Sequence, residues 1–122
     1  MSVQSYRDLI AWQKAMDLVV DVYRGTESSP SREQFGLTNQ ARRAAVSVPS
    51  NVAEGQGRGS TNEYIHFLRV ARGSAQELET QLILAQRLNY LAAPAADDLI
   101  ARTSEVCRII SGLINALRSD EQ

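Results

Sequence analysis

Hydrophobic residues recur every three or four positions along most of the chain, the spacing that gathers side chains on one face of an α-helix. The repeat is most regular in the third of four such segments, with steps of 4, 3, 4, 3, 4 and 3 residues. Its positions are Tyr64, Leu68, Ala71, Ala75, Leu78, Leu82 and Ala85. A period near 3.5 residues is typical of helices in bundles. No segment alternates as a β-strand does.

Capping residues, glycines and prolines divide this pattern into four helices. Asp8 is the expected cap of the first helix, and Ser31 and Ser60 each begin a capping-box sequence. Asn89 stands where a helix end commonly needs the left-handed conformation. The predicted helices cover about 8–24, 31–56, 60–88 and 94–118. We therefore predict an all-α, antiparallel up-down four-helix bundle, with residues 1–122 in a single domain.

Apolar residues off the main helical stripes indicate that copies of the chain associate. A single bundle would expose some of them, although an unusually wide core face is the alternative explanation. These residues are Ile65, Ile83, Leu84, Ile100, Cys107, Ile109 and Ile114. We expect self-association.

The charge of the chain is nearly balanced overall but not along its length. The net charge is −1, which gives no global basic field of the kind most nucleic-acid-binding proteins carry. Residues 42–72, however, hold five arginines against two glutamates. Twelve of the thirteen basic residues are arginine, whose guanidinium suits both carboxylate pairing and phosphate contact.

The compartment expected from the sequence is the cytoplasm. Cys107 is the only cysteine, so it has no intrachain disulfide partner, and its apolar helical position favours a small buried side chain. No signal peptide is apparent, and every apolar run is shorter than the ~20 residues that span a bilayer. A soluble protein with no membrane contact is expected.

Residues 39–64 combine a helical pattern with residues that a plain packing helix avoids. Pro49 removes the amide that would bond the carbonyl of Ala45, so the second helix should kink there. Asn51 is the expected local partner of the freed carbonyl, and Gly55 is expected to belong to the same kink. Gly73, inside the third helix, costs about 1 kcal/mol relative to alanine, which predicts close approach of another helix.

The arginines of this region are candidates for two roles. Neutralising several phosphates would give salt-sensitive, sequence-independent RNA binding. Arg43 and Glu54 are favoured instead for structural or interface roles; they lie about three turns apart, so Glu54 should meet an arginine of another helix or subunit. The residues proposed for phosphate contact are Arg42, Arg58, Arg69 and Arg72.

Enzymatic sites are not indicated. Glu63 and His66 have the Glu-x-x-His spacing of di-iron bundles, but those sites require a second such motif and the chain has one histidine. Cys107 lacks the activating surroundings of a nucleophile. We therefore predict no catalytic residue, no metal, no cofactor and no small-molecule substrate.

Ordered short motifs through the first three helices carry a family resemblance. They are DL at 8–9, WQKA at 12–15, GL at 36–37, Gln40, RRA at 42–44, Ser47, NVAEG at 51–55 and Arg58, then Ser60, Glu63, FL at 67–68, Ala71, GS at 73–74, ELE at 77–79 and QL at 81–82. In this order and spacing they resemble the four-helix bundle proteins encoded in intervening sequences of bacterial 23S ribosomal RNA genes. Related in fold are the accessory proteins of diversity-generating retroelements, which form five-membered rings and bind nucleic acid and a reverse transcriptase.

This resemblance implies a homopentamer with a link to nucleic acid. Two features depart from it: Asn89 stands where the family usually has glycine, and the net charge is negative where the retroelement proteins are strongly basic. Our leading hypothesis is a non-enzymatic oligomer that binds structured RNA or a nucleoprotein partner. The alternative is a protein-binding scaffold whose arginines are used in its own subunit interfaces; metal-dependent catalysis is a distant third.

Overall fold

The computed structural model describes residues 5–33 and 36–120, and these residues form an all-α structure. Its elements are a 3-10 turn η1 (Tyr6–Asp8), helix α1 (Ile10–Gly25), a 3-10 turn η2 (Ser31–Glu33), and helices α2 (Leu37–Gln56), α3 (Thr61–Arg87) and α4 (Ala93–Asp120). No β-strand occurs among the described residues, so the all-α prediction is confirmed.

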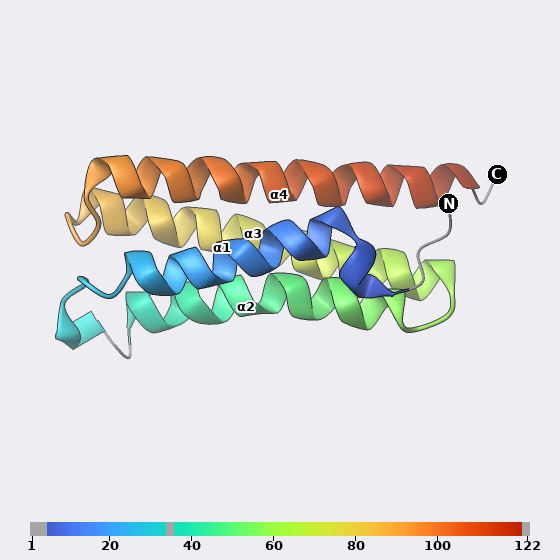
Figure 1. Cartoon of the computed structure of the whole chain (residues 1–122), viewed down its shortest axis with the longest axis horizontal. Coiled ribbons are helices and arrows are strands. Elements are labelled where there is room, and N and C mark those ends of the chain that lie inside the picture. Colours follow the sequence, from blue (N-terminus) through green and yellow to red (C-terminus); the bar gives the residue numbers. More distant parts are fainter. Residues whose placement is uncertain (1–4, 34–35, 121–122) are drawn as a thin grey trace.

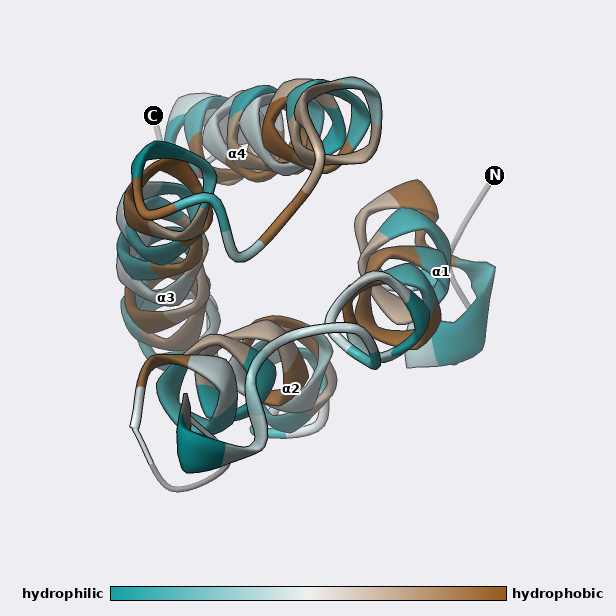
Figure 2. Ribbon diagram, turned by 90° about the vertical axis from the view of Figure 1, so that its left-hand side faces the viewer, coloured by the Kyte–Doolittle hydropathy of each residue, from teal (hydrophilic) through white to brown (hydrophobic). Residues whose placement is uncertain are grey.

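The four helices form an up-down bundle. Each helix runs opposite to the one before it, so the chain returns along the bundle three times (Figure 1). Seen end-on, the helices occupy the corners of a square in the order α1, α2, α3, α4 (Figure 2). In the described part of the chain, the backbones of neighbours around this square approach closely and those of the diagonal pairs do not. Each helix therefore has two flanks, one for each neighbour.

The core forms from the apolar stripes of α2, α3 and α4, together with Ala11, Ala15, Leu18 and Val22 of α1. Larger apolar residues of α1 that are also spaced as a stripe in the sequence, Met16 and Tyr23, are exposed. All the predicted positions of α3 are buried except Tyr64, which is half-buried. Two off-stripe residues, Ile65 and Ile114, also lie in the core, so part of the apolar surplus reflects a wide core face. Leu84, by contrast, is 46% exposed. The buried Thr103 donates its hydroxyl proton to the carbonyl of Leu99, which satisfies the polar group inside its own helix.

The residues predicted to cap the two ends of α3 adopt the expected geometry. The hydroxyl of Ser60 accepts a hydrogen bond from the Glu63 amide at 3.2 Å, as in a capping box. Asn89 adopts φ 61°, the left-handed conformation expected after the helix. Asparagine tolerates this geometry better than most residues, which explains how it stands in for glycine.

The starts of the first two helices differ from the prediction. Asp8 belongs to the turn η1, and α1 begins at Ile10 after Leu9, whose extended backbone ends the turn. Ser31 likewise starts only the short turn η2, and α2 begins at Leu37 after Gly36. The glutamine of the proposed capping box, at position 34, lies outside the described residues. Pattern spacing located these helices but not their first turns.

Pro49 is accommodated within a continuous α2, where it is buried. Asn51 does not reach the carbonyl of Ala45; its amide donates to the carbonyl of Ser47 at 2.8 Å and to the Ser47 hydroxyl at 3.0 Å. The predicted partner was therefore wrong. A side chain on a helix leans back over the preceding turn, so position 51 meets position 47 and not 45.

Close helix approach occurs at Gly55 and not at Gly73. A Cβ atom on Gly55 would lie 2.8 Å from the Cβ of Phe67 and 3.1 Å from the carbonyl oxygen of Tyr64, both on α3. Gly73 is exposed, and nothing lies within 4 Å of where its Cβ would be. The predicted close approach of another helix at Gly73 is therefore wrong for helices of the same chain, because Gly73 lies on the outward side of α3. The absence of a side chain at Gly55 therefore allows α2 and α3 to approach closely at this point.

Candidate nucleic-acid interface

Arg42 has a structural role at the end of α1. Its Nε donates to the hydroxyl of Thr26 at 2.9 Å, its Nη2 donates to the carbonyl of Tyr23 at 3.3 Å, and its guanidinium lies 4.7 Å from the centre of the Tyr23 ring. A cation at this position satisfies a carbonyl of the last turn and opposes the negative end of the helix dipole. These contacts fasten α2 to the end of α1.

Arg58 and Glu54 form an ion pair with each other. Arg58 Nη2 lies 2.6 Å from Glu54 Oε1, and the Arg58 guanidinium is 4.9 Å from the centre of the Phe67 ring. Within the chain, Glu54 therefore pairs with an arginine four residues further along and not with an arginine of another helix. Arg43 is exposed and lines a shallow groove between α2 and α3.

The two remaining candidates, Arg69 and Arg72, lie on the side of α3 that adjoins α4. Arg72 donates to the hydroxyl of Ser111 on α4 at 3.2 Å. Arg69 lies one turn earlier on the same side and is exposed. Of the four arginines proposed for phosphate contact, only these two share a face of the bundle.

Three further arginines join them, and sequence reasoning missed these. Arg108 donates to the hydroxyl of Ser104 one turn earlier on α4, at 3.1 Å. The neighbouring Cys107 is affected by the charges of Arg72 and Glu79 of α3, so this part of α4 adjoins α3. Arg118 lies two turns beyond Ser111, and Arg87 lies five turns beyond Arg69. We call this surface the α3–α4 arginine face; its residues are Arg69, Arg72, Arg87, Arg108 and Arg118, with the acids Glu79 and Asp97 beside them.

The other flank of α4, toward α1, is neutralised by ion pairs. Arg102 lies 2.6 Å from Asp21 and 3.6 Å from Asp98, and Lys14 lies 2.9 Å from Glu105. Burial opposes the charge of Arg102, but the hydrogen bond and charge of Asp21 outweigh it and raise the pKa of the guanidinium. Positive charge on α4 is therefore matched by acids on the α1 flank and exceeds them on the α3 flank.

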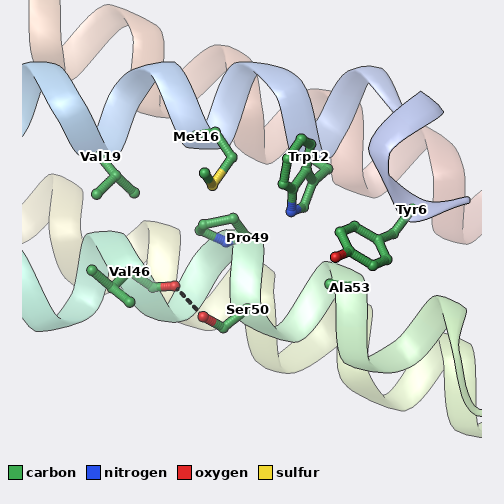
Figure 3. A pocket seen from close by; sticks show the side chains of 8 residues that line it. All are labelled: Tyr6, Trp12, Met16, Val19, Val46, Pro49, Ser50 and Ala53. Carbon is green, nitrogen blue, oxygen red and sulfur yellow. Dashed lines mark hydrogen bonds between the residues drawn. The ribbon is translucent and has the colours of Figure 1, made fainter.

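An apolar groove runs between α1 and α2 (Figure 3). Its volume is about 410 Å³. Met16 and Val46 are 39% and 41% exposed, and the ring of Pro49 faces the groove. The Ser50 hydroxyl donates to the carbonyl of Val46 at 2.8 Å, so this polar side chain is satisfied within α2. The lining residues are Tyr6, Trp12, Met16, Val19, Val46, Pro49, Ser50 and Ala53.

The residues with side chains suited to metal binding or nucleophilic catalysis do not form a common site. His66 is exposed and packs edge-on against Phe67, while the backbone amide of Glu63 serves the cap of α3. Among the described residues, no three His, Cys, Asp or Glu side chains are arranged to hold a metal ion. Burial, and secondarily the charge of Glu79, raises the pKa of the half-buried Cys107 thiol and so disfavours its reactive thiolate.

Among the described residues, no helix has both the length and the apolar character required to cross a bilayer.

Comparisons with known proteins agree on one family. The sequence profile of the family described as "23S rRNA-intervening sequence protein" matches residues 7–112. No curated protein matches the chain significantly. A similar solved structure is the 1.70 Å crystal structure of a protein with unknown function from the S23 ribosomal protein family of Bacteroides thetaiotaomicron. It has a TM-score of 0.80 and 20% identity, over 87% of this chain and 96% of that one.

Proposed function

Because the chain belongs to the 23S rRNA-intervening sequence protein family, we propose that it is a non-enzymatic, cytoplasmic RNA-binding protein that works as a homo-oligomer. The observation that carries this proposal is the α3–α4 arginine face. Five arginines share one side of the bundle with two acids, although the net charge of the whole chain is −1. The helix pairing thus concentrates positive charge that the overall composition conceals.

The arrangement of this face suits phosphate groups. Ser111 and Ser104 hold the guanidinium groups of Arg72 and Arg108 through single hydrogen bonds, which leave their other N–H donors for a ligand. Arginine contacts to phosphates release condensed counterions, so affinity from this source falls steeply with salt. The site proposed from sequence at the helix-two to helix-three junction contributes less, because Arg58 is already paired with Glu54.

Assembly is supported by the apolar groove. Exposed apolar hollows of this kind mark interaction sites on soluble proteins, and a groove on one flank suits the head-to-tail contacts that close into rings. A homopentamer is the assembly that the family resemblance favours. Sedimentation velocity at micromolar concentration tests it: a ring of five supports the assembly, and a compact monomer refutes it.

A protein-binding scaffold without RNA contact is the second candidate. Two of the proposed arginines favour it, because Arg42 and Arg58 are engaged within the chain. The same use of arginines in subunit contacts would occupy the α3–α4 face.

A titration of labelled structured RNA at two salt concentrations separates the candidates. We expect binding at low salt that weakens steeply with added salt. Absence of binding at low salt eliminates the RNA hypothesis.

Paired variants locate the binding surface. Arg69→Gln with Arg118→Gln removes two exposed arginines of the α3–α4 face; Arg7→Gln with Arg24→Gln removes two exposed arginines of η1 and α1, outside this face. The first pair should weaken binding about tenfold or more and lower the salt slope by about one to two, and the second should change either much less. Equal effects of the two pairs would contradict the proposed surface.

A further inference from the structure

We infer that the RNA bound by the α3–α4 arginine face is a double helix, recognised through its sugar-phosphate backbone without regard to sequence. This inference rests on the RNA-binding function proposed above. Three features of the face support it: its length and stiffness, the small polar side chains between its arginines, and the position of every described Tyr, Trp and Phe ring elsewhere on the molecule.

The face is long and rigid. With 27 and 28 residues, α3 and α4 are each about 40 Å long and lie side by side, as both views show (Figures 1 and 2). Arg69 and Arg87, on the same line of α3, are about 27 Å apart along the axis. A flexible single strand would lose conformational entropy in following such a line, as does any disordered segment that orders on binding. A duplex already holds its phosphates in fixed positions.

Small polar residues of α4 lie between the arginines. The hydroxyls of Ser104 and Ser111 orient Arg108 and Arg72, and Asn115 lies exposed one turn beyond Ser111. A Cβ on Gly112 would meet nothing within 4 Å, so the surface there is open to a close backbone. Serine and asparagine side chains commonly contact phosphate and sugar oxygens, and duplex RNA is recognised largely through phosphates and 2′-hydroxyls.

Tyr, Trp and Phe rings, which stack on unpaired bases in proteins that bind single strands, lie away from this face. In the part of the chain that the structure describes, each Tyr, Trp and Phe ring is packed against another element, and the exposed His66 ring packs edge-on against Phe67. Tyr6 and Trp12 contact each other at the apolar groove, Tyr23 lies under Arg42, Tyr64 and Phe67 meet α2 at Gly55, and Tyr90 lies under Arg32. The α3–α4 arginine face therefore offers cations and hydroxyls, which suit a backbone more than a splayed base.

The test compares three labelled RNAs with the unmodified protein at low salt. The first is a hairpin of about 20 base pairs, longer than the ~16 base pairs that double-stranded-RNA-binding domains span. The second is an unpaired strand with the same number of phosphates, and the third is a hairpin of unrelated sequence. We expect both hairpins to bind within about threefold of each other and at least about tenfold more tightly than the strand.

The outcomes distinguish failure of the duplex inference from failure of the proposed RNA-binding function. A strand that binds as tightly as the hairpins, or a preference above about tenfold for one hairpin sequence, overturns the duplex inference but leaves RNA binding intact. Failure of all three RNAs to bind overturns the proposed function itself. If the duplex is bound elsewhere, Arg69→Gln with Arg118→Gln will leave hairpin affinity unchanged, which overturns the assignment to this face.

Discussion

The two flanks of α2 are built differently. Toward α3, Gly55 leaves no room for a Cβ, and the hydroxyls of Ser47 and Ser74 hydrogen-bond across the seam at 2.8 Å. Toward α1, Val46 and its neighbours line an open apolar groove of about 410 Å³. The same helix therefore makes a close contact at Gly55 with a shallow polar groove beside Ser47 and Ser74 on one side, and borders an open apolar groove on the other.

This difference shows how one short bundle can be both stable and associative. Small residues let two helices approach until their backbones nearly touch, which removes voids and fixes the pair. Large apolar residues around a groove leave surface that another molecule can cover. We therefore expect the α2–α3 pair to be the more tightly packed part of the bundle. A second copy of the chain is expected to bind on the side of α2 that faces α1.

The largest effect should come from a charge in the groove. Val46→Lys places an ammonium among apolar side chains, and an unpaired charge buried at an interface costs several kcal/mol. We expect sedimentation to show monomers at micromolar concentration, while circular dichroism shows the helical fold retained. Leu88→Lys, a similar change at an exposed leucine directly after α3, is the control and should leave assembly intact. An unaltered oligomer in Val46→Lys would show that the groove is not a subunit contact.

The next largest effect concerns the close contact between α2 and α3. Gly55→Ala and Gly73→Ala gain the same helix propensity, about 1 kcal/mol, but only Gly55 lacks space for the methyl group. We expect Gly55→Ala to destabilise by roughly 2 kcal/mol and Gly73→Ala to stabilise by up to about 1 kcal/mol, as measured by urea unfolding of each variant. If the two variants gained stability equally, the α2–α3 seam would be looser than described.

A smaller effect should follow from Ser74→Ala. This change removes the hydrogen bond to Ser47, which also accepts from Asn51. A loss of about 1 kcal/mol is expected in chemical denaturation. Ser50→Ala is the matched control on the groove side, where the hydroxyl bonds only within its own helix; it should cost less. A larger loss for Ser50→Ala would reverse the proposed ranking of the flanks.

The smallest effect is a dependence on pH at Tyr64, which packs against Gly55. Burial raises the pKa of the Tyr64 phenol. Because the folded-state pKa lies above the unfolded value of about 10, the contribution is present below that pH and is lost as pH rises through the folded pKa. Tyr64→Phe should therefore lose less stability than the parent between pH 8 and about 11 in denaturant titrations. If the free energies of unfolding of the parent and of Tyr64→Phe changed in parallel with pH, the Tyr64 phenol would be solvated in the folded protein.

The fold could be read from sequence because its signals are local. The 3.5-residue stripe of α3, the Ser60 cap and the left-handed Asn89 each depend on residues within a few positions of one another. The start of α2 was missed because Ser31 begins a 3-10 turn that local spacing does not distinguish from a first helical turn. The partner of Asn51 was missed for a geometric reason, the backward lean of helical side chains.

Only part of the α3–α4 arginine face could be predicted from the sequence. Arg69 and Arg72 are three residues apart, so sequence alone places them together. Arg108 and Arg118 follow more than 30 residues later, and helical periodicity cannot say which flank of α4 will adjoin α3. Arg42 and Arg58 look equally free in sequence, yet Thr26 and Glu54 engage them.

The amino-acid sequence by itself determined four amphipathic helices and their order, because apolar periodicity and caps act over one or two turns. Only the tertiary structure decided that Gly55 and not Gly73 marks a close contact, that five arginines share the α3–α4 face, and that Pro49 borders an apolar groove. These features depend on which flanks meet across the bundle, and that choice depends on packing between residues far apart in the chain.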